Sequence, residues 1–192
     1  MRLRPPLRVT VTRHEEKEQK LQEFVCQHLQ GADGGSAGHL LIVARSLESP
    51  VIKALAGLSH EIAAAGRSAR VILAYIDREA MAEEWARTIT FPHEIRWAKH
   101  PRLIEAHEQL VLGPETCWIG DCMRRDPAKC DAYESYVEGC GEAAGCATVS
   151  FERLWLACQP LVSQSLGRIG SLAQAPMAFG EGESQPTVGT RH

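Results

Sequence analysis

Apolar positions follow two periodicities along the chain, and together they predict alternating strands and helices. Nearly continuous apolar runs at residues 39–45 (HLLIVAR) and 69–76 (ARVILAYI) predict strands that are buried on both faces. The segment between them carries apolar residues at helical spacing, namely Val51, Leu55, Leu58 and Ile62. We expect Ser49 to cap this helix, Pro50 to begin it and Gly66 to end it. Strand, helix and strand in this order predict a βαβ unit with parallel strands.

Weaker patterns extend this unit in both directions. An alternating strand is predicted at residues 8–12 and an amphipathic helix at 14–30, followed by a glycine-rich connector at 31–38. Beyond the unit, a helix is predicted at 77–89 and a short strand at 94–98. These elements favour an α/β fold in which a mixed β-sheet is flanked by helices.

The remaining sequence predicts a hairpin, a closing helix and a tail. Strands are expected at 107–112 and 116–120, on either side of a Gly-Pro turn, and a polar loop then runs to Glu134. A glycine-rich connector leads to a helix at 151–160, and from about residue 167 the apolar periodicity stops. We therefore expect three regions. An N-terminal strand, helix and connector occupy residues 1–37, an α/β domain occupies 38–162, and a disordered tail occupies 167–192.

Composition and charge narrow the classes of function. The 192 residues suffice for one domain with a real core, and 44% of them are hydrophobic. The net charge is −3, so no global basic field indicates nucleic acid or anionic membrane, and any phosphate site has to be local. No apolar run approaches the roughly 18–20 residues of a membrane span. With no signal peptide evident, we expect a cytoplasmic protein whose seven cysteines are free thiols.

The stretch from Ala106 to Glu134 gathers the residues that could carry chemistry. It contains a histidine at the start of a strand, a Gly-Asp after the next strand, two arginines and a later carboxylate. These are His107, Gly120, Asp121, Arg124, Arg125 and Glu134. If the protein has a site, the sequence predicts it here.

The order of the segments resembles one half of the phospholipase D superfamily, the phosphodiesterase fold built on an H-x-K motif. The matching segments are LLIVARS, SPVIKALAGLSHEIAAAG, ARVILAYID, EIRWA, HEQLVL, CWIGDCMRR, DAYE and FERLW. The resemblance covers roughly Gly38 to Leu161. It implies the α/β fold of a single phospholipase-D-like half.

The catalytic motif of that family is matched only in part. The family has H-x-K-x(4)-D, then G-S-x-N after the next strand, and a later acidic residue. His107, Gly120 and Glu134 stand at the histidine, glycine and acid positions. The lysine position holds Gln109, and the aspartate position lies near Pro114 and Glu115. The serine and asparagine positions hold Asp121 and Met123.

The resemblance implies roles for these residues and also leaves simpler alternatives open. In the family the histidine attacks phosphorus, while the lysine and polar neighbours hold the phosphate oxygens. His107 would then be the nucleophile oriented by Glu134, or else a strand histidine bonded to backbone. Glu134 could instead simply pair with Arg124 or Arg125. The two arginines could bind phosphate, with Gln109 and Asp121 as the other substrate-binding positions, or form a solvated patch. Losing one charged donor costs about 10²–10³ in rate, so hydrolysis is expected to be lost or altered.

A group of cysteines offers a competing hypothesis. Five of them stand at spacings C-x4-C-x7-C-x9-C-x5-C, namely Cys117, Cys122, Cys130, Cys140 and Cys146. Structural zinc sites usually bring their ligands in C-x(2–4)-C pairs, and no C-x-x-C occurs. We therefore assign no metal and no cofactor, and keep a cysteine-based metal or redox protein as a second alternative.

Three classes of function follow. The first is a phospholipase-D-like binding or regulatory module that no longer hydrolyses well. The second is an active phosphodiesterase or nuclease that uses His107, and the third is the cysteine-based protein. For the first two we expect a phosphate-containing ligand, with nucleic acid left open, and a homodimer, because single-motif members of the family pair two halves to complete one site.

Overall fold

The computed structural model describes residues 7–11, 14–31, 38–76, 89–99, 106–124 and 132–161. Its strands are β1 (Leu7–Val11), β2 (His39–Ala44), β3 (Ser68–Leu73), β4 (His93–Trp97), β5 (His107–Gly113), β6 (Thr116–Cys122), β7 (Ala132–Val137) and β8 (Gln159–Pro160). Its helices are α1 (His14–Gly31), α2 (Pro50–Gly57), α3 (Ser59–Ala64) and α5 (Gly141–Ala157). All of them belong to one compact unit, Met1–Leu161.

The described strands form one mixed sheet in the order β1-β7-β6-β5-β2-β3-β4-β8. Strands β2, β3 and β4 run parallel, and the other neighbours are antiparallel. The predicted βαβ unit is therefore confirmed, with α2 and α3 as its crossover. Strand β1 joins the far edge of the same sheet by pairing with β7.

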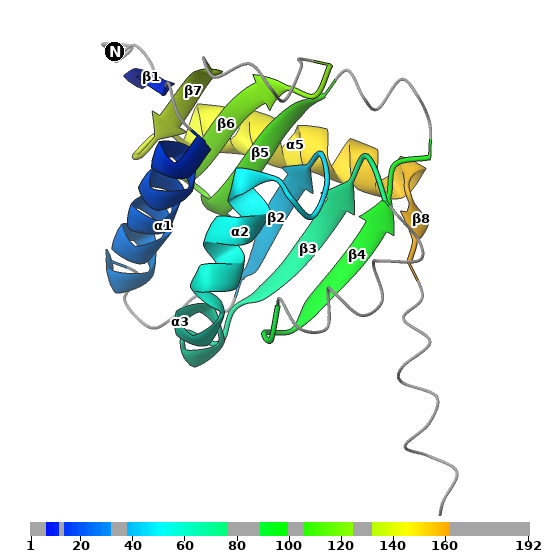
Figure 1. Ribbon diagram of the computed structural model, residues 1–192, viewed down its shortest axis with the longest axis horizontal. Helices are drawn as coiled ribbons and strands as arrows, with labels where there is room; N and C mark the ends of the chain where they lie inside the picture. Colours follow the sequence, from blue (N-terminus) through cyan, green and yellow to red (C-terminus); the bar gives the residue numbers. More distant parts are fainter. Residues whose placement is uncertain are drawn as a thin grey trace, which may run out of the picture. The chain divides into compact units, whose positions relative to one another are not determined.

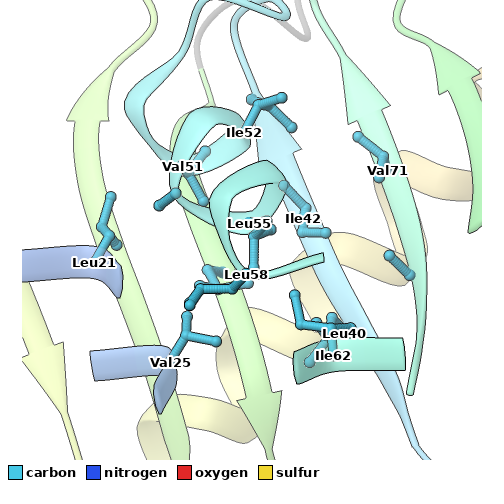
Figure 2. Close-up of a cluster of buried hydrophobic side chains, with 14 of the residues drawn as sticks. Leu21, Val25, Leu40, Ile42, Val51, Ile52, Leu55, Leu58, Ile62 and Val71 are labelled. Carbon is cyan, nitrogen blue, oxygen red and sulfur yellow. The ribbon is translucent and has the colours of Figure 1, made fainter. Parts of the chain in front are cut away.

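Helices cover both faces of the sheet. Helices α1, α2 and α3 lie on one face, and α5 crosses the other face (Figure 1). The first interface buries aliphatic side chains of α1, α2 and α3 against β2 and β3, among them Leu21, Leu55, Ile62, Ile42 and Val71 (Figure 2). The apolar runs of β2 and β3 are explained by this arrangement, because alternate side chains enter the two separate cores.

Two arginines of the parallel strands fix α5 against its face of the sheet. Arg70 of β3 pairs with the Glu152 carboxylate through both terminal nitrogens, and its guanidinium lies 4.3 Å from the centre of the Trp155 ring. Arg96 of β4 lies over the same ring at 4.4 Å and donates to the Trp155 carbonyl oxygen. Cation–π contacts and charged hydrogen bonds together stabilise the position of this helix.

The helix predicted between Ser49 and Gly66 is divided in two. Helix α2 ends at Gly57 and α3 begins at Ser59, with the intervening Leu58 at φ −106° and ψ 16°. Ser49 also does not cap α2 with its side chain. Its hydroxyl instead donates to a Glu108 carboxylate oxygen at 2.6 Å and accepts from the backbone N–H of Ser46 at 3.1 Å.

Two boundaries in the second half differ from the prediction. Glu134 lies inside β7 rather than at the end of a loop, because this segment pairs with both β6 and β1. Helix α5 begins at Gly141, ten residues before the predicted start, and so includes two of the glycines assigned to a connector. Its Ala144 and Ala147 pack on the sheet, and this burial outweighs the low helix propensity of glycine.

Several predictions concern residues outside the described part of the chain. These are most of the connector at 31–38, the helix expected at 77–89, of which only Ile89 is described, Arg125, Cys130, and the tail at 167–192.

Candidate functional site

His107 is held by the backbone of the neighbouring strand. It is the first residue of β5, pairs with Cys122 of β6, and has an exposed side chain. Its Nδ1 atom lies 2.9 Å from the carbonyl oxygen of Gly120. Because a carbonyl can only accept, Nδ1 must carry the hydrogen. In the neutral ring the lone pair is then on Nε2, which is the state a nucleophilic histidine needs.

Gly120 owes its identity to a close approach. A Cβ atom at this position would lie 2.5 Å from two ring atoms of Trp118, whose side chain is only 1% exposed. The large ring therefore covers the backbone that orients His107. The sequence singled out Gly120 as a motif position, and the structure gives a packing reason for a residue without a side chain there.

Glu134 interacts with the N-terminal helix and not with His107. Glu134 is 2% exposed, and its carboxylate accepts a hydrogen bond from the Tyr136 hydroxyl at 3.2 Å. The Lys17 ammonium of α1 lies 3.6 Å from the other carboxylate oxygen. Burial raises the pKa of Glu134, the neighbouring Lys17 opposes that rise, and the nearby Asp121 charge adds to it. The same burial, together with Glu134, raises the pKa of Tyr136.

Lys17 is a site residue that the sequence reasoning missed. Its side chain is 15% exposed and also lies 3.8 Å from the Asp121 carboxylate. One ammonium thus faces two carboxylates, Asp121 and Glu134, at the serine and acid positions of the motif. Lys17 lies in a helix with many charged residues, and no local pattern sets it apart from its neighbours.

Gln109 is directed into the core. It is 7% exposed, and its amide nitrogen donates to the carbonyl oxygen of Ala147 in α5 at 3.3 Å. Its strand neighbours are Val43 and Ile119. The residue at the lysine position therefore has its polar group bonded to a helix backbone, where a phosphate does not reach it.

The remaining predicted ligands lie at the end of β6. Asp121 is partly exposed beside Lys17, and Arg124 follows the strand with an exposed side chain. Arg125 is outside the described residues. Among the predicted site residues, the structure therefore places His107 against the Gly120 carbonyl. It also places Asp121 and Glu134 around the same Lys17 ammonium.

The described cysteines are all free thiols. Burial raises the pKa of Cys117, and the nearby Cys140 adds to this; burial also raises the pKa of Cys158 to about 11. A thiol with a raised pKa is a poor nucleophile and a poor metal ligand at neutral pH. Within the described residues, no group of three or more His, Cys, Asp or Glu could hold a metal ion.

Comparison with known proteins identifies the fold. No family model matches the chain, and no curated protein matches its sequence. Among solved structures, the phospholipase D family member Nuc from Salmonella typhimurium has a TM-score of 0.54 and 13% identity, over 82% of this chain and 99% of that one. NucT from Helicobacter pylori has a TM-score of 0.50 and 8% identity, over 82% of this chain and 100% of that one.

A third similar structure is TrmBL2, described as an archaeal chromatin protein with a novel mode of DNA binding. It has a TM-score of 0.51 and 12% identity over 84% of this chain, which spans 57% of the TrmBL2 chain. The chain thus has the α/β fold of a single phospholipase-D-like half domain, as the sequence predicted. None of the helices in the described residues is long and apolar enough to cross a membrane.

Proposed function

We propose that this protein is a phospholipase-D-like module that binds a phosphodiester, nucleic acid in particular, without hydrolysing it efficiently. One observation carries the proposal: the side chain at the motif lysine position, Gln109, is buried and bonded to Ala147. A second observation supports the proposal: the Glu134 carboxylate pairs with Lys17 and accepts a hydrogen bond from Tyr136. The side chains at the positions that would stabilise a pentavalent phosphate and orient the histidine, Gln109 and Glu134, thus make contacts within the fold instead.

The choice of nucleic acid rests on the kinds of protein that have this fold. TrmBL2 is described as a chromatin protein that binds DNA, and nucleases of the phospholipase D family also have the fold. Proteins that contain this fold thus include a DNA-binding protein as well as nucleases. A ligand with a repeating phosphodiester backbone suits a surface with an exposed His107 at the start of β5 and an exposed Arg124 just after β6.

Activity and binding can be separated with one variant. We expect wild type and His107→Ala to cleave bis(p-nitrophenyl) phosphate at equal, background rates. We also expect wild type to raise the fluorescence anisotropy of a labelled DNA oligonucleotide, and to do so less well in high salt. No binding to DNA, with binding to anionic phospholipid vesicles instead, would contradict the nucleic-acid assignment.

The alternative is an active phosphodiesterase, and the His107 ring favours it. With Nδ1 bonded to the Gly120 carbonyl, Nε2 is available to attack phosphorus and form a phosphohistidine, releasing the alcohol product. Water would then cleave the phosphohistidine. In that case His107→Ala would lower the cleavage rate by about 10² or more, and acid-labile phosphate would be trapped on the wild-type protein only.

We also infer a homodimer for either function. A single half carries one histidine, and the family resemblance implies that two halves pair around a two-fold axis. Sedimentation at micromolar concentration is expected to give about twice the 21.1 kDa mass of the chain. A clean monomer that still binds DNA would exclude a site shared between two copies.

A further inference from the structure

The antiparallel register of β2 and β5 brings an arginine to the histidine. The paired residues run from Leu41 with Val111 to Val43 with Gln109. Arg45 directly follows β2, and the same register continued by two positions would set it opposite His107, the first residue of β5. The strand pairing itself ends at Val43 and Gln109, and beyond it the Arg45 backbone N–H donates to the side-chain carboxylate of Glu108 at 3.0 Å. Residues directly opposite in an antiparallel pair have side chains on the same face.

The guanidinium of Arg45 reaches across the end of β5. Its Nη2 atom lies 3.5 Å from the carbonyl oxygen of Cys122 in β6. Cys122 pairs with His107 from the other side. The Arg45 side chain therefore starts just after β2, the strand on one side of β5, and ends at β6, the strand on the other side.

We propose that Arg45 provides, beside His107, the positive charge for phosphate that the motif lysine would provide at position 109. The proposal rests on the proposed function, whose site it makes more specific. A guanidinium offers several N–H donors in a planar fork, which can hold two oxygens of one phosphate. The positive charge would thus come from the residue that follows β2, although Gln109 faces the core.

Lys17 and Glu108, two other charged residues near this end of the sheet, also have partners within the fold. Lys17 faces Asp121 and Glu134, so that group as a whole does not attract an anion when both carboxyls are ionised. The Glu108 carboxylate accepts hydrogen bonds from the Ser49 hydroxyl and from the backbone of Arg45. Its charge is therefore partly neutralised by donors before a phosphate arrives.

The backbone of Arg45 is fixed, which limits the entropy lost on binding. Its N–H donates to Glu108, and its carbonyl oxygen accepts from the Tyr75 N–H at 2.8 Å. Its guanidinium also contacts the Cys122 carbonyl oxygen, so a ligand meets a side chain that is already positioned. Because the backbone bonds do not depend on the side chain, substitution at this position is expected to leave the fold intact.

The test is a titration with inorganic phosphate, followed through the ring signals of His107 in NMR spectra. Wild type is expected to show a saturable shift of these signals. Arg45→Gln should weaken the apparent affinity about tenfold, and Arg45→Lys should retain most of it because it keeps the charge. Arg153→Gln is the matched control: it removes an exposed arginine of α5 and should leave the affinity unchanged.

Two results would overturn the role of Arg45. One is equal affinity of wild type and Arg45→Gln, with both folded; the other is the absence of any shift at His107 in wild type. Neither result depends on hydrolysis or on DNA binding, so failure here is distinguishable from failure of the proposed function. A protein that hydrolyses phosphodiesters yet loses phosphate affinity in Arg45→Gln would refute the binding-module proposal and support this one.

Discussion

Lys17→Met is expected to lower the free energy of unfolding by about 3 kcal/mol at pH 7. The change leaves the Glu134 carboxylate, which is 2% exposed, without the ammonium 3.6 Å away. Removing one member of a buried pair costs more than the pair itself contributes, since the other charge stays in a medium that solvates it poorly. Methionine keeps most of the aliphatic stem of lysine, so packing changes little.

The same variant should become more stable when the pH is lowered. Burial already raises the pKa of Glu134 in the folded state above its value in the unfolded chain. Between these two pKa values the folded state binds more protons, so stability falls as the pH rises through this window. Without Lys17 the folded pKa rises further, and the loss of stability between pH 5 and pH 7 becomes larger.

Urea denaturation of wild type and variant at both pH values measures this effect. Lys53→Met is the matched control, because Lys53 pairs with Glu48 while both side chains are exposed, by 39% and 67%. It should cost less than about 1 kcal/mol. Adding Glu134→Gln to Lys17→Met should restore part of the stability and remove most of the extra pH dependence. Equal losses for Lys17→Met and Lys53→Met would show that the Lys17 pair is effectively solvated.

Gly120→Ala is expected to destabilise the protein by about 2–3 kcal/mol, at the upper end of what overpacking costs. The added methyl group would lie 2.5 Å from two atoms of the Trp118 ring. That ring is 1% exposed inside the core between the sheet and the helices, so it has little room to move away. Either the ring or the β6 backbone has to shift.

A shift of the β6 backbone would also reach the site, because the Gly120 carbonyl fixes the His107 ring. The His107 ring signals are therefore expected to change in Gly120→Ala, beside the loss of stability. Gly145→Ala serves as the control, since a Cβ there would meet nothing within 4 Å. In the interior of α5 it should stabilise the protein by about 0.5–1 kcal/mol. If both variants have the stability of wild type, the Trp118 ring does not restrict position 120.

Some of the candidate site residues have a local signal in the sequence. His107 stands at the start of a strand with a typical apolar pattern, and Gly120 follows the next strand, so both could be found from the sequence. The sequence could indicate Glu134 as an acidic candidate, but it could not indicate which residue Glu134 contacts. Its contact with Lys17 joins β7 to α1 across more than a hundred residues, and nothing in either segment indicates the other.

In helix α5 the local sequence pattern gave the wrong prediction. Its first turns contain Gly141 and Gly145, which locally favour a connector. They are helical because Ala144 and Ala147 bury their side chains against the sheet, a contact that exists only once the sheet has formed. Packing energy from residues distant in the sequence outweighed a local preference.

The sequence by itself determined the α/β class, the parallel β2–β3 unit and the candidate histidine, because burial on both faces of a sheet leaves continuous apolar runs. The tertiary structure alone decided which charges meet. It turned Gln109 to the Ala147 carbonyl, engaged Glu134 with Lys17, and brought the Arg45 guanidinium to the carbonyl of Cys122, the strand partner of His107. These outcomes depend on strand register and on the packing of helices against the sheet, and a shift of one residue in register would move each side chain to the other face.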